Sequence, residues 1–600
     1  MKLVAFTVRN YRSIVEAYKL SLDNYTVLVG PNNEGKSNLL KAVVLSLNLL
    51  TRPETSEGKD PFSCNGLKDI KSSGVFGVFQ VSGNRGSPTH GGFQMIMRGM
   101  VERRKRSIER RLNGPITQGF SQPMLSASNI HFELSERTRA ISHGGIGLIH
   151  QLVREIGLAE AIDRGVQVLK IHLPYHESDH VLNLAYNAIC EGRCLEDIEL
   201  RRNDEVFLDA LGTQRIPDPT TAGDFCRRFR CRGPIDRLQD AFDEARRVVW
   251  AKQPEAFFAQ ATIDMDGHLV ATAGECKQGM DIAYDGTWGY HPLLVSLANT
   301  GEVLRVVNRP GNRPSHEGAA AECDRAIALC RRAGFRKILL RGDTDFSQSE
   351  HLDRWDADGV QFHFGYDATT NLKEIADNLP KTAWKKLVRP PRWEARTGER
   401  RRPDKIKQEI VCKREFEVLK LKSEEVAEFA YQPTKCKKTY RMIAIRKNIS
   451  VEKGEKRLFD EIRYFFYITN DHPSTPAEVV FSANDRCNQE NLIEQLSNGV
   501  RAFRAPVDNL FSNWAYMTMT ALAWNLKAWW ALRLPEDGRW AEKHRKEKQT
   551  VLKMEFRRFV NYLVRIPCQI LRSGGRLIYR LLNWTPWLGV FRRLASELEC

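Results

Sequence analysis

The apolar periodicity of this chain is lost between Thr51 and Gln122, and this break most constrains how the chain can fold. Helices and strands need apolar residues at regular spacing, because each element must bury one face. Within the break Gly, Ser, Pro and Asn dominate, and neither spacing persists for more than a few residues. Since 600 residues exceed what one hydrophobic core accommodates, we expect separate domains on the two sides of the break.

The segment before the break predicts two strands, a tight loop and a helix. Leu3–Arg9 alternates apolar and polar residues, and Tyr25–Val29 is a short apolar run. The motif that follows, Gly30-Pro-Asn-Asn-Glu-Gly35-Lys36-Ser37, fits G-x-x-x-x-G-K-[ST] without a mismatch. Gly30 and Gly35 would let backbone N–H groups face a phosphate, Lys36 would reach the outer phosphates, and Ser37 would bind Mg²⁺.

Residues 1 to about 50 resemble the start of RecF-like and SMC-like ABC-type ATPases. An active P-loop ATPase also needs an acidic Mg²⁺ partner after a second apolar strand. The candidate, Asp343 after Lys337–Leu340, lies some 300 residues away and has a second interpretation given below. We therefore predict a vestigial nucleotide loop, where ATP binding is possible and hydrolysis is not expected.

The charge of the chain favours a polyanionic partner. Its 91 Lys and Arg residues exceed its 74 acidic residues by 17, and the isoelectric point is about 9.3. Within the break, Arg103–Arg111 holds six basic residues, and this run predicts a solvated linker or a contact with DNA phosphates. No apolar run is long enough for a membrane span, and the odd number of scattered cysteines fits a reducing cytoplasm.

The regular spacing of apolar residues returns after the break, and the type of element that it predicts changes along the chain. Helices are predicted from about Gly144 to Trp250, one of them capped by Thr220 or Thr221. Strands and helices then alternate, which predicts an α/β domain; the expected strands are Phe258–Val270, Leu293–Leu297, Val303–Val307 and Lys337–Leu340. Strand patterns dominate from about Lys405 to Asn470, and helices return after Asn488, where Ala515–Leu532 predicts a buried helix.

Acidic residues follow several of these strands. Asp264 and Asp266 share one face of a strand, Asp343 and Asp345 follow another, and Glu490 opens a helix with Glu494 one turn later. Two aspartates and a glutamate brought together could hold a pair of Mg²⁺ ions for phosphodiester chemistry. Spacing alone does not distinguish them from solvated acids at strand ends.

From about Phe132 onward, the chain resembles DDE transposases of bacterial insertion sequences, and more narrowly the insertion-sequence family numbered 1380. The resemblance rests on five blocks: TIDMDG, GECKQGMDIAYDGTWGYHPLLVSLANTGEVL, NRPGNRPSHEGA, ILLRGDTDFSQSEHLDRW and RCNQENLIEQL. It implies an RNase H-like catalytic core with a mainly β insertion between the second aspartate and the glutamate.

The resemblance also implies roles for individual residues. Asp266 takes the first carboxylate position, with Asp264 left as a competitor, while Asp343 takes the second and Glu490 the third. These three would be the catalytic residues and would bind two Mg²⁺ ions. Arg486 fits the arginine of the Y-x2-R-x3-E-x6-K signature and would contact DNA, with a helix-capping or salt-bridging role as the alternative. Independently of the resemblance, the turn after Val303–Val307 carries Arg309 and Arg313, which predict either a contact with DNA phosphates or flanking DNA, or an ordinary surface turn. The chain departs from the family at three positions, which are His268 for Thr, Ala483 for Tyr and Ser497 for Lys.

The predicted fold class is α/β. The expected order is a partial P-loop ATPase-like segment (1–72), a poorly ordered junction (73–130) and a helical DNA-binding region (131–250). The RNase H-like core (251–375 and 476–535) would enclose an insertion domain (376–475), and a basic helical tail (536–600) would follow.

The predicted function is Mg²⁺-dependent cleavage and strand transfer at the ends of an insertion sequence by a cytoplasmic DDE-type transposase. The partners would be double-stranded DNA, as terminal inverted repeats and target, and a second copy of the chain on paired ends. The break would mark an insertion of the element into an ATPase gene. Two alternatives stay open: a DNA-acting protein regulated by ATP, and an end-binding repressor of transposition that has lost catalysis.

Overall fold

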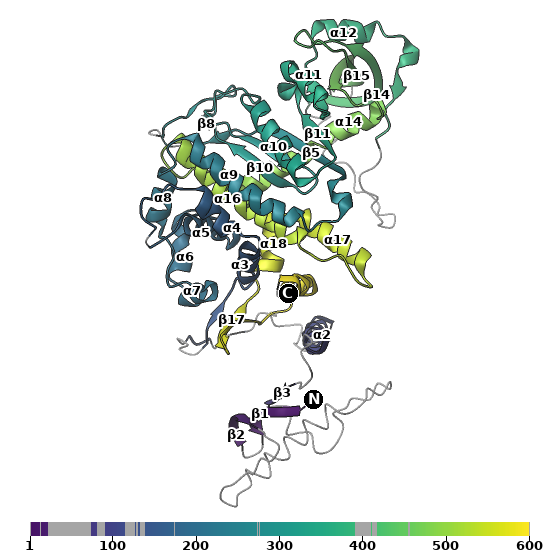
Figure 1. Ribbon diagram of the computed structural model, residues 1–600. Helices are drawn as coiled ribbons and strands as arrows, with labels where there is room; N and C mark the ends of the chain where they lie inside the picture. The colour runs from purple at the N-terminus through teal and green to yellow at the C-terminus, as the bar shows by residue number, and fades with distance from the viewer. Residues whose placement is uncertain are drawn as a thin grey trace, which may run out of the picture. The chain divides into compact units, whose positions relative to one another are not determined.

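A computed structural model gives the fold, and its elements are shown in Figure 1. It describes residues 2–11, 14–21, 74–80, 91–113, 127, 130–132, 138–172, 174–272, 274, 277–389, 410, 414, 417–453 and 456–598. The chain divides into two compact units, Met1–Asn113 and Gly114–Cys600. The phosphate loop and the predicted strand Tyr25–Val29 lie outside the described residues.

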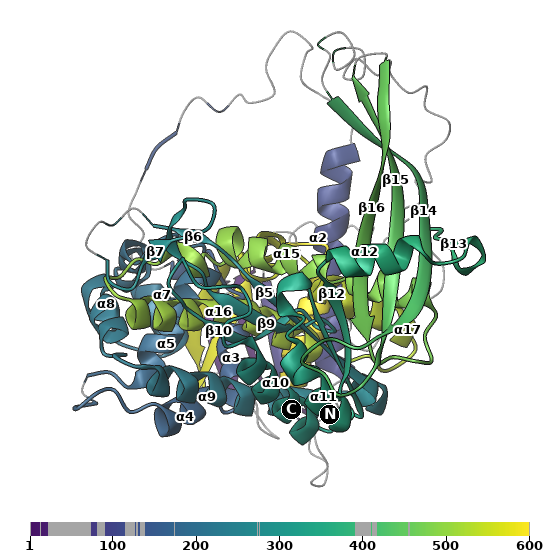
Figure 2. The same cartoon turned by 90° about the horizontal axis from the view of Figure 1, so that it is seen from above.

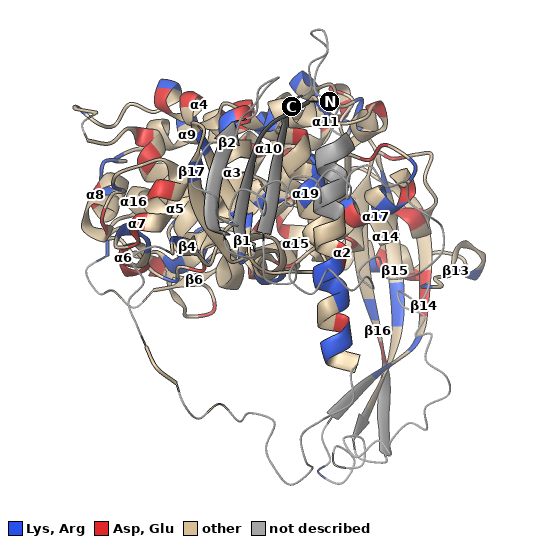
Figure 3. Ribbon diagram, turned by 90° about the horizontal axis from the view of Figure 1, so that it is seen from below, with Lys and Arg blue, Asp and Glu red and all other residues tan. Residues whose placement is uncertain are grey.

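The first unit contains a three-stranded antiparallel sheet and a long helix. The strand order is β2-β1-β3, with β1 at Lys2–Tyr11, β2 at Ile14–Ser21 and β3 at Gly74–Gln80. β1 confirms the strand predicted at Leu3–Arg9. Helix α2, Gly91–Asn113, lies in the interval where the sequence shows no persistent apolar spacing. Its second half carries the basic run, blue in Figure 3, whose Arg, Lys and Glu residues favour a helix without forming an apolar stripe.

The second unit is organised around a nine-stranded mixed sheet of order β10-β9-β5-β11-β12-β16-β15-β14-β13. β5 (Gln260–Gly267), β11 (Lys337–Gly342) and β12 (Gln361–Tyr366) run parallel to one another. β9 (Leu293–Leu297) is antiparallel to β5, and β10 (Glu302–Val307) is antiparallel to β9. The strands predicted in this part of the sequence are all present.

Helices cover both faces of this part of the sheet. Helix α10 (Ala319–Ala333) connects β10 to β11 and contacts β5 and β9, and α11 (Ser349–Ala357) connects β11 to β12. Because side chains alternate along β5, Met265 meets Cys323 of α10 while Asp264 and Asp266 point to the other face. That opposite face receives α14 (Pro476–Asn484) and α15 (Cys487–Glu494).

The strand-rich segment predicted after Lys405 extends the same sheet. β14 (Glu417–Tyr431), β15 (Tyr440–Lys453) and β16 (Lys456–Thr469) form a long antiparallel meander, drawn green in Figure 2. β16 pairs with β12, and the short β13 (Lys385–Lys386) pairs with β14 at the edge. Helix α12 (Thr370–Asp377) precedes the meander. The insertion is therefore continuous with the central sheet through main-chain hydrogen bonds.

A helical layer precedes the sheet in sequence. Its helices are α3 (Ile146–Glu155), α4 (Leu158–Gly165), α5 (Glu177–Ile189), α6 (Glu199–Arg202), α7 (Glu205–Leu211), α8 (Pro219–Arg227) and α9 (Arg232–Trp250). The prediction that Thr220 or Thr221 caps a helix is wrong by two to three residues. Asp218 is the N-cap of α8 and accepts a hydrogen bond from Thr221 N, because Pro219 suits the first helical position.

Helix α16, Leu510–Leu532, is buried along nearly its whole length and packs against α5, α9 and β10. This confirms the buried helix predicted at Ala515–Leu532. The segment after it was predicted to be helical and is so only in part. Helices α17 (Ala541–Leu552), α18 (Phe556–Phe559) and α19 (Leu588–Leu598) flank a hairpin of β17 (Cys568–Ser573) and β18 (Arg576–Leu581). Gly574 and Gly575 form its two-residue turn with positive φ angles, a conformation that favours glycine.

Two shorter sheets complete the second unit. β17 also pairs with β4, Ala140–Ile141, so the end of the chain is joined to the start of the helical layer. The segment between β5 and β9 in the sequence forms a small sheet of order β6 (Val270–Ala271), β8 (Trp288–Tyr290) and β7 (Asp281–Ile282). Across the described part of the chain, no helix has the length and apolar character needed to cross a membrane.

Candidate active site

Two of the predicted carboxylates, Asp266 and Asp343, meet at the carboxyl ends of the adjacent strands β5 and β11. In each of them Oδ1 accepts a backbone hydrogen bond, from Gly267 N at 2.8 Å and from Asp345 N at 3.0 Å respectively. Their Oδ2 atoms both face the guanidinium of Arg486, at 3.0 Å from Asp266 and 3.7 Å from Asp343. Asp343 and Arg486, which follow Asp266 by 77 and 220 positions in the sequence, thus form one charge cluster with it.

The electrostatics of this cluster favour binding of a cation. The pKa of Asp266 is raised to about 6, chiefly by burial and also by Asp343, whereas Arg486 opposes the shift. Burial also raises the pKa of Asp343, again against the effect of Arg486. Two partly desolvated carboxylates that face the same group repel each other unless that group carries a positive charge. Arg486 supplies that charge in this structure.

The neighbouring Asp264 is engaged differently. Its two oxygens accept hydrogen bonds from Nε and Nη2 of Arg341 at 2.7 and 2.8 Å, and both side chains are buried. Nη1 of Arg341 donates to Ser482 O of α14 at 2.8 Å. This bidentate pair links β5 to β11 and to α14, and it leaves Asp264 oriented toward an arginine at both oxygens.

Glycine is needed directly after Asp266 because the chain is crowded there. A Cβ on Gly267 would lie 2.5 Å from Nε2 of His291, a buried side chain that is itself fixed by a hydrogen bond to Arg313 O at 2.8 Å. The close approach of His291 therefore explains the Asp-Gly pair on physical grounds.

Helix α15 lies along the end of β5 and presents Glu490 on the same side as Arg486. The two residues are four positions apart and so lie one above the other on the helix. Seven residues after Glu490, Ser497 Oγ lies 3.3 Å from Nε2 of His268. Glu490 therefore lies between Arg486, which contacts Asp266, and Ser497, which contacts His268. The side chain of Glu490 itself is exposed. His268 and Ser497, two of the departures from the family pattern, are in contact with each other.

Glu490 does not complete a closed metal cluster. Among the described residues, no group of three or more His, Cys, Asp or Glu side chains is arranged to hold a metal ion. The buried neighbour of Glu490, Gln489, donates to Asp264 O at 3.3 Å and to Leu294 O at 3.1 Å, which secures α15 to β5 and β9. The structure therefore brings Asp266, Asp343 and Arg486 together and leaves Glu490 at the exposed rim.

The two arginines of the loop after β10 have different environments. Arg309 is buried, and its guanidinium donates to four carbonyl oxygens, those of His291, Pro314, Ser315 and Glu317, at 2.7 to 3.1 Å. Arg313 is about half exposed and forms an ion pair with Glu317 at 3.6 Å. Arg309 therefore organises the loop on which Arg313 is presented. Contact of either residue with DNA stays a prediction.

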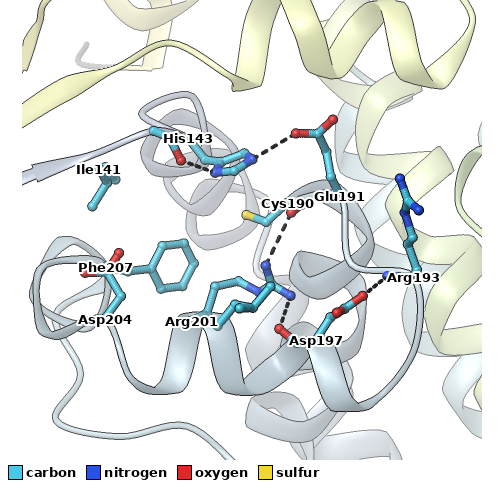
Figure 4. A pocket seen from close by; sticks show the side chains of 11 residues that line it. Ile141, His143, Cys190, Glu191, Arg193, Asp197, Arg201, Asp204 and Phe207 are labelled. Carbon is cyan, nitrogen blue, oxygen red and sulfur yellow. Dashed lines mark hydrogen bonds and ion pairs between the residues drawn. The ribbon is translucent and has the colours of Figure 1, made fainter. Parts of the chain in front are cut away.

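The remaining predicted site residues, Gly30, Gly35, Lys36 and Ser37, lie outside the described part of the structure. A separate cavity of about 540 Å³ lies in the helical layer, and none of the predicted site residues lines it. Figure 4 shows its lining, where buried Arg201 donates to the carbonyl oxygens of Cys190 and Asp197. Both acidic and basic side chains line it, so the cavity has no single charge character.

Sequence reasoning did not identify Arg341 or Gln489 as parts of the site. A signal for Arg341 exists, since it is a charged residue at the end of the apolar strand Lys337–Leu340, two positions before Asp343. A buried arginine at such a position needs a carboxylate partner. Gln489 gives no comparable signal, because an amide before Glu490 is equally compatible with an exposed position.

Comparison with known proteins gives two family matches. Residues 126–600 match the family model described as Transposase DDE domain group 1, and residues 1–76 match the model described as AAA ATPase domain. No curated protein matches the chain. Among solved structures, a piggyBac transposase synaptic complex with hairpin DNA is similar at 11% identity, with a TM-score of 0.31, over 70% of this chain and 82% of that chain.

Proposed function

Because the chain belongs to the Transposase DDE domain group 1 family, we propose that it cleaves DNA at the ends of an insertion sequence and joins the freed 3′ ends to target DNA. The observation that carries this proposal is the convergence of Asp266 and Asp343 on one cationic group, with Glu490 on the adjoining helix face. We further propose that residues 251–375 and 476–535 form an RNase H-like core. The order β10-β9-β5-β11-β12, with only β9 reversed relative to both of its neighbours, supports this assignment.

The residues present fit a divalent metal such as Mg²⁺. Hard carboxylate oxygens are its preferred ligands, and Asp266 and Asp343 each direct one oxygen toward a position that already favours positive charge. Asp266, Asp343 and Glu490 would hold two ions. Bound metal would activate the attacking oxygen and stabilise the leaving oxygen of the phosphodiester.

The chain's own residues orient these ligands. The backbone N–H groups of Gly267 and Asp345 fix one oxygen of each aspartate, so the other oxygen is available for a cation. Asp264 is occupied by Arg341, which supports Asp266 as the metal ligand. Arg486 neutralises the two aspartates and, once they have other cationic partners, becomes available to a DNA phosphate. Exposed Arg313 would contact flanking DNA, while buried Arg309 would hold the shape of its loop.

The remaining assignments follow from the family and from the division of the chain. Residues 131–250 and the basic tail would bind terminal inverted repeats, and two copies of the chain would act on paired ends. Residues 1–76 would be a nucleotide-binding fragment joined to the transposase, since their family match stops well before the transposase match begins.

The test is Mg²⁺-dependent cleavage of a duplex that carries the DNA flanking the chain's own coding sequence. We expect Asp266→Asn, Asp343→Asn and Glu490→Gln each to abolish cleavage while binding persists. Matched controls are Asp345→Asn and Glu494→Gln, which remove an exposed neighbouring carboxylate in each case and should retain cleavage. Wild-type binding without cleavage would instead identify an end-binding repressor, and cleavage by the three variants would refute the assigned carboxylates.

A further inference from the structure

The hairpin of β7 and β8 exposes three large apolar side chains that nothing in the proposed reaction uses. Ile282 and Trp288 lie directly opposite each other on the paired strands and are 57% and 44% exposed. Directly opposed residues share one side of a two-stranded ribbon, so these two form a continuous outer surface. Tyr284, in the turn between the strands, is 91% exposed.

The hairpin is firmly built, so this exposure is not a consequence of a loose loop. Ala283 N donates to Thr287 O at 2.8 Å, and Asp285 Oδ1 accepts from Thr287 N at 2.9 Å. Gly286 has a φ of 86°, as expected at the left-handed position of a three-residue hairpin turn. On the inner side Gly311 N donates to Gly289 O at 3.0 Å, and a Cβ on Gly311 would meet Asp281 O at 2.3 Å.

The hairpin is close in space to the aspartate pair. β6, which pairs with β8, begins four residues after Asp266 on the same chain segment. Trp288 precedes Leu294 by six residues, and Leu294 is paired with Asp266. At about 3.3 Å per extended residue, the chain from Trp288 to Leu294 spans at most roughly 20 Å, and the step across the strand pair to Asp266 adds about 5 Å. The sum is the length of about seven stacked base pairs. β6 and β7 lie at the edge of the body in Figure 2.

The charges on the hairpin select which part of DNA it can contact. Asp281 and Asp285 flank the exposed rings, and they would repel the phosphate backbone. An aromatic ring without adjacent basic residues instead suits the face of a base, and bases stack on Tyr and Trp with little sequence preference. In duplex DNA a base can leave the stack and lie on such a ring only where it is unpaired, as at a frayed or overhanging end.

We propose that Tyr284, Trp288 and Ile282 form a stacking surface for an unpaired base of the DNA end that is held at Asp266 and Asp343. This inference rests on the proposed function, since it presupposes that a DNA end is bound there. The surface would retain the end base after the duplex opens and would keep the cleaved strand in position. It adds a contact to a base, in contrast to the phosphate contacts expected of Arg486 and Arg313.

The test compares two probes in fluorescence anisotropy with metal removed by EDTA. Both carry the DNA flanking the chain's own coding sequence; one is blunt, and the other ends in a short unpaired 3′ overhang. We expect wild type to prefer the overhang probe. The double variant Tyr284→Ala/Trp288→Ala should lose roughly 5- to 150-fold affinity for it, the contribution of stacking one base, while its affinity for the blunt probe stays within about twofold.

Controls separate loss of stacking from other effects. Tyr284→Phe keeps the ring and should bind as wild type does, and Trp540→Ala removes a 59% exposed tryptophan elsewhere and should have no effect. With 5-iododeoxyuridine in the overhang, ultraviolet light should cross-link the base to the peptide containing residues 284–288.

Three outcomes would decide against the proposal. Equal affinity of wild type and the double variant for the overhang, with cross-links elsewhere, would overturn it. Unchanged DNA binding with a smaller sedimenting species in the double variant would identify the hairpin as a contact between two copies of the chain, and this also overturns it. Failure of wild type to bind either probe would count against the proposed function as well as the stacking surface, and wild-type cleavage measured separately would distinguish the two.

Discussion

Substitution of Asp266 by Asn should stabilise the fold while it removes activity. The pKa of Asp266 in the folded chain is about 6, against an ordinary value of 3.8, because burial disfavours its charged form. Between about pH 4 and pH 6 the folded state therefore binds more protons than the unfolded state, and stability falls as pH rises through this window. A pKa shift of about two units lowers the free energy of unfolding at neutral pH by roughly 3 kcal/mol. An uncharged Asn at this position does not incur this loss.

Burial raises the pKa of the neighbouring Asp264 as well, against the effect of Arg341. Its substitution should nevertheless respond with the opposite sign, because this carboxylate neutralises a buried arginine. Asp264→Asn breaks the bidentate pair with buried Arg341 and leaves a guanidinium without its carboxylate. Breaking a buried pair by removing one partner costs about 3–5 kcal/mol. Two aspartates two residues apart on one strand are thus expected to differ by about 6–8 kcal/mol in their effect on stability at neutral pH.

The assay is urea unfolding followed by tryptophan fluorescence, with EDTA present to exclude metal. All 12 tryptophans lie between Trp250 and Trp587, so fluorescence reports on the second unit alone. At pH 7.5 we expect the Asp266→Asn midpoint above wild type and the Asp264→Asn midpoint below it. At pH 4 the Asp266→Asn difference should disappear. If Asp266→Asn proves as destabilising as Asp264→Asn at pH 7.5, Asp266 has a structural role and the reasoning fails.

Three further predictions concern other parts of the chain. Burial lowers the pKa of Lys527 to about 7, so its charged form is costly; Lys527→Met should raise the thermal midpoint most at pH 6 and least at pH 10, and an increase independent of pH would contradict this. Arg309→Ala should remove the hydrogen bonds to four carbonyls and make the loop 308–318 sensitive to proteolysis, whereas Arg313→Ala should leave it resistant. A chain beginning at Leu125 should fold and bind DNA as the full chain does, because the first unit ends at Asn113; loss of DNA binding on this truncation would show that the N-terminal segment is functional.

Much of the second unit could be predicted from sequence. Leu293–Leu297 and Lys337–Leu340 are apolar runs bounded by polar residues, and they form strands β9 and β11 because burial on both faces requires that pattern. The resemblances to DDE transposases and to an ATPase start are confirmed by the two family matches. Other elements were missed because their signal is not apolar spacing: α2 depends on charged helix formers, and the β17–β18 hairpin depends on a Gly-Gly turn.

The sequence by itself determined the family, the order of strands and helices along most of the second unit, and the residue types available for catalysis. These properties are local, since each depends on the spacing of residues within one segment. The tertiary structure alone decided which carboxylates share a cation, because Asp266, Asp343 and Arg486 are distant in sequence and meet only when β5, β11 and α15 pack together. It also distinguished Asp264 from Asp266, since the alternation of a strand places both on one face, and the positions of Arg341 and Arg486 give them different environments.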